Sequence, residues 1–349
     1  MPSSRIMQPV PTRSAVTRDV FEGEVRPAGR PVILKGQIAH WPIVAAARAG
    51  NVAVAAAIAA NADPRPVPVA HAPHEAGGRF HYRGDWSGFT FDRTPMPLAD
   101  FMELLLAERV NPAPRALATQ GLLLDEVLPH FSAVHSLDLL PRSVAGRMWI
   151  CNRSSVATHG DDLENLACMA AGRRRFTLFP PDQIGNLYMG PFQPTPGGTP
   201  ISMVHVTAPD TDRYPRFATA LDSAWEAVLE PGDALYLPYQ WYHHVEGLDA
   251  INVLVNYWWD DSRPDIGSRW DALLHAMITM RSLPEDQRAA WKTLFDHYAF
   301  ITNGDPGAHL PEAVRGILGP HDRKALAQYQ ADLRANLDPA STQKVGPLK

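Results

Sequence analysis

Residues 225–259 constrain the fold more than any other part of this 349-residue sequence. They contain a Pro-Gly-Asp turn, a short apolar run, a histidine pair at His243 and His244, and a β-branched run that ends in Asn-Tyr-Trp-Trp. Short runs of β-branched and aromatic residues between turn residues are typical of β-strands. The stretch therefore predicts one wall of a β-barrel. Its histidines are candidate metal ligands, because imidazole is the commonest metal ligand in proteins.

A second group of candidate ligands lies upstream, at His159 and Asp161. In an extended segment residues i and i+2 point to the same side, so the imidazole and the carboxylate converge. Two histidines and one carboxylate can hold Fe(II) on one face and leave its other positions open. The His-x-Asp pattern occurs once in the sequence, but among 14 histidines it can also arise by chance.

The third ligand is expected from the histidine pair. Because side chains alternate along a strand, His243 and His244 face opposite sides, and only one of them can share a metal with His159. The turn at Gly232 and the strand end at Pro238 favour His243 as the residue that faces the barrel interior. Two alternatives stay open: His243 as a core histidine packed among aromatic residues, and His244 as a group behind the site or on the surface.

The chain divides into three parts. Residues 1–18 are polar and proline-rich, which predicts a segment that is disordered or draped over the surface. Residues 19–262 form the main domain, with an alanine-rich helix after residue 42. Its further strands are expected at 31–36, 147–152, 165–169, 175–179 and 202–206. Residues 263–349 have apolar residues at helical spacing, which predicts helices that serve either packing or a homodimer interface.

Composition and charge narrow the classes of partner. The formal net charge of -5 and the pI near 6.3 give no electrostatic reason to expect binding to nucleic acid or to a membrane. No apolar run is long enough to span a bilayer, and the N-terminus lacks the apolar core of a signal peptide. Cys151 and Cys168 are too few for a disulfide framework and fit a reducing compartment. We therefore expect a cytoplasmic protein whose partner binds in a pocket.

Six motifs together resemble a cupin-like JmjC domain. They are His159-x-Asp161, Gly172-Arg-Arg-Arg-Phe176, Leu178-Phe-Pro-Pro181, Gly232-Asp-Ala-Leu-Tyr-Leu-Pro238, Trp241-Tyr-His-His-Val245 and Asn256-Tyr-Trp-Trp259. The resemblance runs from residue 31 through residue 259. The chain is most similar to the Fe(II)- and 2-oxoglutarate-dependent hydroxylases that include the asparaginyl hydroxylase acting on hypoxia-inducible factor, and it looks like a bacterial-type member.

The resemblance implies a mainly β fold: a double-stranded β-helix (cupin or jelly roll) with N-terminal helices and a C-terminal helical extension that dimerises. It implies Fe(II) held by His159, Asp161 and His243, with 2-oxoglutarate as cosubstrate and O2 as oxidant. Arg174 stands where the family has a lysine for the distal carboxylate of 2-oxoglutarate, and an arginine can bind that group with two hydrogen bonds. Asn165 and Asn256 match polar positions of the cosubstrate pocket.

Two positions depart from the family. Val156 replaces a threonine, and Leu117 aligns with a tyrosine, so two hydroxyl groups are missing unless Ser154, Ser155 or Thr158 compensates. The first hypothesis is an oxygenase that hydroxylates a protein side chain or a small molecule. The second, which the missing hydroxyls favour, is a cupin-fold protein that binds a metal or ligand without turnover, or a metal-dependent cupin enzyme that does not use 2-oxoglutarate.

Overall fold

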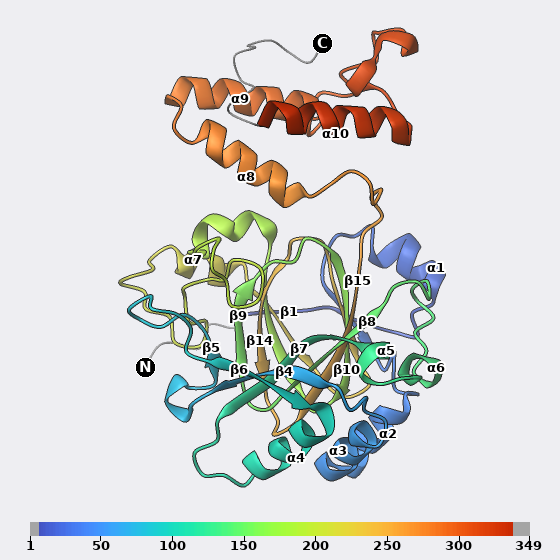
Figure 1. Ribbon diagram of the computed structural model, residues 1–349, viewed down its shortest axis with the longest axis vertical. Coiled ribbons are helices and arrows are strands. Elements are labelled where there is room, and N and C mark those ends of the chain that lie inside the picture. Colours follow the sequence, from blue (N-terminus) through green and yellow to red (C-terminus); the bar gives the residue numbers. More distant parts are fainter. Residues whose placement is uncertain (1–6, 338–349) are drawn as a thin grey trace. The chain divides into compact units, whose positions relative to one another are not determined.

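The computed structural model describes residues 7–337, and residues 1–6 and 338–349 lie outside this description. The chain splits into two compact units, residues 1–260 and 261–349, and each is described by itself. The first unit is mainly β and contains two large sheets (Figure 1). This jelly-roll architecture, with helices before it and after it in the chain, is the fold class that the sequence predicted.

The two sheets contain all the named strands of the described chain. The six-stranded sheet has the order β1 (Gln8–Pro9), β12 (Trp225–Leu229), β11 (Arg174–Phe179), β14 (Tyr242–Gly247), β9 (Ser155–His159) and β5 (Arg79–Phe80). The nine-stranded sheet has the order β2 (Thr12–Ser14), β3 (Val32–Lys35), β13 (Ala234–Leu237), β10 (Glu164–Ala171), β15 (Asn252–Trp259), β8 (Gly146–Cys151), β7 (Ala116–Leu123), β4 (Pro66–Ala72) and β6 (Asp92–Pro97). Neighbours are antiparallel except for β1 with β12, β2 with β3 and β5 with β9, which are parallel.

The helices of the first unit are short. They are α1 (Arg18–Val20), α2 (Pro42–Ala49), α3 (Asn51–Ala59), α4 (Leu98–Glu108), α5 (Leu124–Val127), α6 (Phe131–Val134) and α7 (Phe217–Asp222). The alanine-rich stretch forms two helices rather than one, because Gly50 lies between them with a φ of 110° that an alanine rarely adopts. Ile43 and Val44 of α2 and Leu98 of α4 are buried in one core cluster with β10, so these helices cover the outer face of the nine-stranded sheet.

Side-chain alternation along β10 divides the core in two. Leu166 and Cys168 belong to the cluster under the helices. Ala167 and Met169 belong to a second cluster with Phe176 of β11, so this second cluster lies between the two sheets. A strand that is buried on both faces has a nearly continuous apolar sequence, without alternating polar residues. This alternation decides which residues can reach the interior of the barrel, where the candidate site lies.

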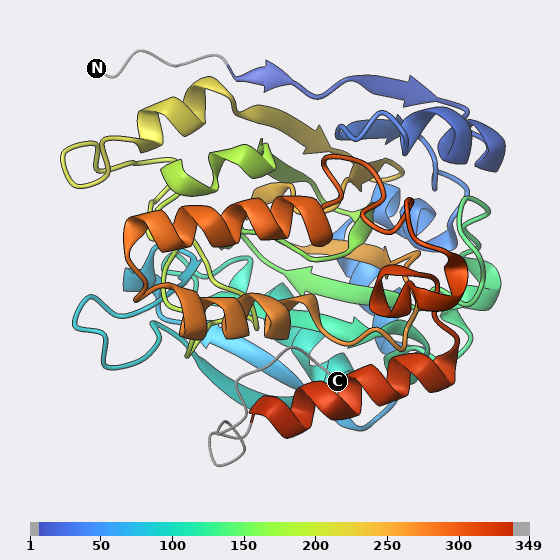
Figure 2. The same ribbon diagram turned by 90° about the horizontal axis from the view of Figure 1, so that it is seen from above.

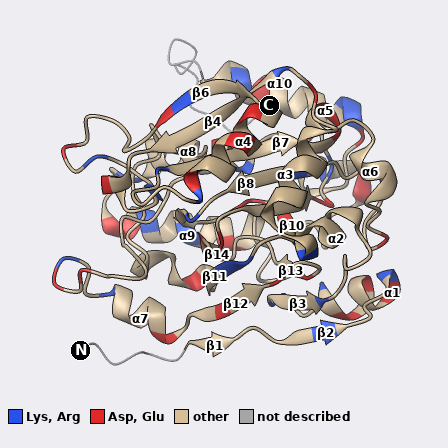
Figure 3. Cartoon of the chain, turned by 90° about the horizontal axis from the view of Figure 1, so that it is seen from below, with Lys and Arg blue, Asp and Glu red and all other residues tan. Residues whose placement is uncertain are grey.

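The N-terminal segment was expected to be disordered or draped over the surface, and its residues 8–14 follow the second alternative. Gln8 pairs with Trp225 and Thr12 pairs with Ile33, so β1 and β2 extend the edges of the two sheets (Figure 3). Edge strands present unpaired backbone groups, and a passing segment can satisfy them without any apolar pattern of its own. Residues 8–14 are therefore strands on the surface, while residues 1–6 lie outside the described residues.

The strand expected at 202–206 does not form. Ser202 makes only an isolated bridge with Met189. The Ser202 hydroxyl donates to the carbonyl of Leu187 and accepts from the amide of Val204, which bends the chain into a turn. The segment is consequently a connection beside the end of β9.

The second unit contains α8 (Arg269–Met280), α9 (Glu285–Tyr298) and α10 (Arg323–Leu337), drawn orange to red in Figure 2. None of the described residues in these helices is buried. Large apolar side chains are exposed on them, among them Ile278, Trp291, Leu294, Tyr298 and Leu333. Between residues 7 and 337, no helix combines the length and the apolar character that crossing a bilayer requires.

The turn between β10 and β11 generates a prediction about stability. Gly172 has a φ of 69°, and a Cβ there would lie 2.2 Å from the carbonyl oxygen of Ile251. Gly36 has the same φ of 69° but nothing within 4 Å. We expect Gly36→Ala to lower the free energy of unfolding by ~1 kcal/mol, and Gly172→Ala by ~3 kcal/mol or more, because the clash adds to the backbone strain. Urea unfolding followed by tryptophan fluorescence measures both, and equal losses would refute the close approach.

Candidate functional site

Two histidines and one aspartate meet inside the barrel. One ligand atom from each of His159, Asp161 and His243 lies within 4.8 Å of the others. The Nε2 atom of His243 is 3.7 Å from Oδ2 of Asp161, and the two imidazole centroids are 4.2 Å apart. The arrangement follows from the pairing of β9 with β14, which sets His159 opposite His243.

A β-bulge adjusts the spacing along β9. His243 pairs with His159 and Val245 pairs with Val156, so two steps on β14 correspond to three steps on β9. An extra residue in one strand reverses the alternation beyond it. For this reason Val156 and His159, three residues apart, both reach the wall of the same cavity.

Hydrogen bonds orient the two imidazoles. Nδ1 of His159 donates to the carbonyl of Ala157 at 2.9 Å, and Nδ1 of His243 donates to the carbonyl of Trp241 at 3.0 Å. A proton held on Nδ1 leaves the Nε2 lone pair free for a metal. Burial, and then the neighbouring His159, lowers the pKa of His243 to about 4, so this ring is neutral near pH 7.

The donor set fits a divalent metal. Oδ2 of Asp161 is buried and has no hydrogen-bond partner among the described residues. A buried carboxylate oxygen without a partner is costly unless a cation offsets it. Two imidazoles and one carboxylate on one side are the ligands that suit Fe(II) with open positions.

His244 lies on the other face of β14. It is buried, its Nδ1 has no partner in the described chain, and it is not part of the group around Asp161. Burial, followed by the nearby His205 and His159, lowers its pKa to about 3. The structure therefore brings His243 to the group and leaves His244 behind it, as alternation predicted.

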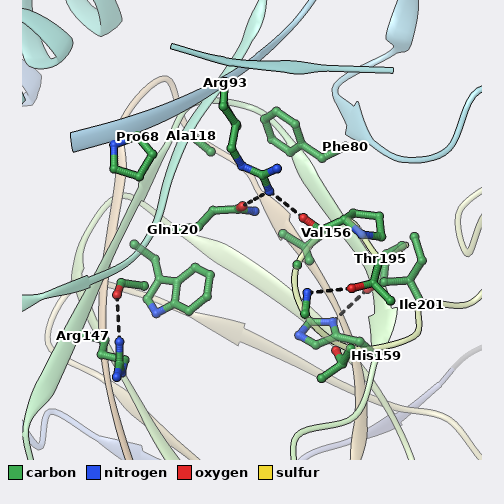
Figure 4. Close-up of a pocket in the computed structure, with 18 of the residues that line it drawn as sticks. Pro68, Phe80, Arg93, Ala118, Gln120, Arg147, Val156, His159, Thr195 and Ile201 are labelled. Carbon is green, nitrogen blue, oxygen red and sulfur yellow. Dashed lines mark hydrogen bonds between the residues drawn. The ribbon is translucent and has the colours of Figure 1, made fainter. Parts of the chain in front are cut away.

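A cavity of about 560 Å³ opens beside His159 (Figure 4). Val156 and Trp149 line it from the barrel, and residues 195–199 and 201 form part of its rim. The volume is within the ~300–1,000 Å³ typical of ligand sites. The walls also carry Arg93 and Arg147, which the sequence analysis did not single out.

Arg174 points into the barrel, beside a smaller recess of about 20 Å³ that Trp149 and Val156 also line. The side chain is 5% exposed, and its Nη2 donates to the carbonyl of Trp149 and contacts Sγ of Cys151. Its Nε is buried without a partner, and no carboxylate of the described residues lies within 4.0 Å of the guanidinium. Arg174 is thus a buried cation that lacks a described counter-ion.

The two asparagines do not reach the walls of these cavities. Asn165 and Asn256 are buried, but neither lines the cavity beside His159 or the recess beside Arg174. Oδ1 of Asn256 accepts a hydrogen bond of 2.7 Å from the indole of Trp149, which lines the cavity. Oδ1 of Asn165 is buried without a partner in the described chain. The assignment of both asparagines to the cosubstrate pocket stays a prediction.

Leu117 lies away from the recess beside Arg174. This residue, aligned in the sequence analysis with a family tyrosine, is fully buried in the core cluster under the helices. Thr119 on the same strand pairs with Val69 and Ile150 of that cluster, so its side chain faces the helices as well. Ser154 lines the recess.

Comparison with known proteins places these features in context. A model of the cupin-like domain matches residues 17–265. A lysine-specific demethylase, JMJ31 of Arabidopsis thaliana, is 34% identical over 30% of this chain and 19% of its own length. The tRNA wybutosine-synthesizing protein 5 of Gallus gallus is 30% identical over 38% of this chain and 43% of its own. The Jumonji C domain-containing protein 5 of Drosophila melanogaster is 25% identical over 72% and 60%. The matches span less than two thirds of these relatives.

The neighbouring histidines give a matched test of the metal site. We predict that His243→Ala weakens Mn(II) binding at least ~100-fold, because it removes a ligand, whereas His244→Ala retains most of the affinity. Isothermal titration of the purified chain under anaerobic conditions measures both. Thermal unfolding of each variant controls for misfolding, since both side chains are buried. Equal losses of affinity in two folded variants would contradict the assignment of His243.

Proposed function

The chain belongs to the cupin-like domain family, and on that premise we propose that it is an Fe(II)- and 2-oxoglutarate-dependent oxygenase. Proteins of the JmjC type within this family typically use both groups. The proposal assigns the metal to His159, Asp161 and His243 and the distal carboxylate of 2-oxoglutarate to Arg174. The observation that carries it is the buried guanidinium of Arg174, which has no described counter-ion in the barrel that holds the three ligands.

The strand register supports this pairing of sites. Arg174 lies opposite Gly247 on β14, and His243 lies opposite Leu178 four residues away. At ~3.3 Å per residue this separates the two backbone positions by ~13 Å. A metal bond, a five-carbon dicarboxylate and an arginine side chain together span such a distance. Gly247 suits this place because a Cβ there would come within 2.5 Å of the Asn152 carbonyl.

Electrostatics supports an anionic cosubstrate. An unpaired charge inside a protein is costly, and an anion that pairs with it offsets the cost. The recess beside Arg174 is smaller than a carboxylate, so binding requires the surrounding side chains to move. Ser154 offers a hydroxyl group in this recess and can replace one of the two that are missing at Val156 and Leu117.

Bound Fe(II) and 2-oxoglutarate supply the oxidation, in which one atom of O2 enters a substrate C–H bond as hydroxyl and the other enters succinate as CO2 leaves. The protein holds and orients these groups. The carbonyls of Ala157 and Trp241 fix both imidazoles. Trp149 and residues 195–199 line the cavity beside His159, and a substrate bound there displaces water from it.

A second candidate function is a cupin-fold protein that binds a metal or ligand without turnover. Val156 favours it, because a valine in the cavity wall cannot donate a hydrogen bond to a cosubstrate. The narrow recess favours it as well. A metal-dependent cupin enzyme without 2-oxoglutarate belongs with this alternative.

Several finer assignments belong to the proposal. The free thiols of Cys151 and Cys168 fit a cytoplasmic location. The likeness to the asparaginyl hydroxylase and to bacterial-type members, and the absence of a nucleic-acid partner, remain predictions. The relatives carry names for a demethylase and for a protein of tRNA modification, so the substrate is assigned by none of them.

The cosubstrate assignment predicts a spectroscopic result. Anaerobic addition of Fe(II) and 2-oxoglutarate should produce a metal-to-ligand charge-transfer band. Arg174→Gln should weaken 2-oxoglutarate ~10- to 100-fold, since a charged hydrogen bond is lost, while Fe(II) still binds. Arg173→Gln is the control, because Arg173 is an exposed neighbour paired with Asp249. Metal binding without any band in the native chain would favour the second candidate function.

The C-terminal helices predict a homodimer. Trp291 and Leu294 of α9 are exposed on the single chain, and covering such apolar faces stabilises an assembly. We expect analytical ultracentrifugation to give twice the chain mass. Trp291→Glu combined with Leu294→Glu should restore the single mass, whereas Val52→Glu, on an exposed position of α3, should not. A monomeric native chain at micromolar concentration would refute the dimer.

A further inference from the structure

The cavity beside His159 carries positive charge on its walls. Arg93 of β6 and Arg147 of β8 line it, together with Gln120 of β7 (Figure 4). No aspartate or glutamate is among the lining residues of this cavity. Two guanidinium groups without an acidic neighbour in one concave space raise the local concentration of anions.

Neither guanidinium is neutralised within the described chain. Nη2 of Arg93 donates to the carbonyl of Pro196 and to Oε1 of Gln120, and Nη1 of Arg147 donates to the carbonyl of Gly121. No carboxylate of residues 7–337 lies within 4.0 Å of either group. Each guanidinium has five N–H donors, so most of them stay available to a ligand.

Contacts with aromatic rings, together with these hydrogen bonds, hold the two arginine side chains in place. The Arg93 guanidinium lies 4.8 Å from the ring of Phe91, and that of Arg147 lies 5.8 Å from the ring of Trp258. With Oε1 of Gln120 turned to Arg93, the amide nitrogen of Gln120 remains as a further donor. Fixed donors lose little conformational freedom when they bind an anion.

We propose that the substrate carries an oxyanion, a carboxylate or a phosphate, which Arg93 and Arg147 bind in this cavity. The inference rests on the proposed function, since His159 on the same cavity wall sets where the reacting C–H bond must lie. A substrate anchored at the arginines presents its uncharged part to the metal ligands. The pair thereby selects acidic substrates.

The position of the arginines separates this anion from the cosubstrate. Arg174 lies buried beside the recess on the six-stranded sheet. Arg93 is on β6, the edge strand of the other sheet, and its side chain is exposed to solvent. An entering molecule meets Arg93 before it reaches the barrel interior. Gln120 and Arg147, on the neighbouring strands β7 and β8, extend the donor surface inward from it.

The test uses the full chain loaded with Mn(II) and saturated with 2-oxoglutarate. Isothermal titration with N-acetylglutamate, N-acetyl-O-phosphoserine and the neutral N-acetylglutaminamide compares the probes. We expect an anionic probe to bind at least ~10-fold tighter than the neutral one, and the tighter of the two anions identifies the preferred group. Arg93→Gln and Arg147→Gln should each weaken that probe ~10- to 100-fold. Arg48→Gln, an exposed position of α2, is the charge-matched control.

The proposal is overturned if the neutral probe binds as tightly as the anions, or if the two variants bind like Arg48→Gln. The affinity for 2-oxoglutarate is measured in parallel, and a matching loss there would assign the arginines to the cosubstrate instead. If the proposed function itself is wrong, the result is different: 2-oxoglutarate does not saturate the native chain. In that case the Mn(II) form alone is titrated with the same probes, and the same comparison decides the role of the arginines.

Discussion

The antiparallel pairing of β9 with β14 is the interaction on which the candidate site depends. It sets His159 opposite His243, and the two rings reach one point only because backbone hydrogen bonds fix their strands. The bulge in β9 then turns Val156 toward the same cavity. A one-residue change of register would send His159 to the other face and separate the ligands. The strand register therefore determines whether the ligand atoms of the candidate metal site can meet.

A second constraint is the uncompensated charge of the barrel interior. Arg174 is buried without a described counter-ion, and Asp161 has a buried oxygen without a partner. The cation and the anion lie in different places, so they do not neutralise each other directly. A metal bound at Asp161 would offset the charge of the carboxylate, and a dicarboxylate that reaches Arg174 would pair with the guanidinium. The unpaired polar atoms of Asp161 and Arg174 are therefore chemically complementary to the metal and the dicarboxylate that the proposal assigns to the barrel.

Local sequence patterns predicted part of this arrangement. The i and i+2 spacing of His159 and Asp161 and the alternation of His243 with His244 are local, and the structure places these residues as the pattern predicted. Alternation required some of Arg173, Arg174 and Arg175 to face outward, and the resemblance to the family motif chose Arg174 as the inward one, where the structure buries it. The jelly-roll class followed from the resemblance of residues 31–259 to a cupin-like JmjC domain, whereas the residues themselves predicted only one wall of a β-barrel.

The remainder depends on contacts between distant segments. Arg93, Gln120 and Arg147 meet at one cavity only because β6, β7 and β8 lie in one sheet, and no local period encodes that order. The pairing of β1 and β2 uses backbone groups, and the single buried valine between them, Val10, is too short an apolar pattern to predict strands. Trp149 bonds to Asn256, a residue 107 positions away, and no local pattern encodes that contact.

A crystal structure of the chain with Mn(II) and 2-oxoglutarate, grown without oxygen, tests the central claim most directly. The account predicts one metal bound by Nε2 of His159, a carboxylate oxygen of Asp161 and Nε2 of His243. It also predicts that the distal carboxylate lies against the guanidinium of Arg174, with the side chains around the recess displaced. A metal held by other residues, or a 2-oxoglutarate whose distal carboxylate lies away from Arg174, would contradict it.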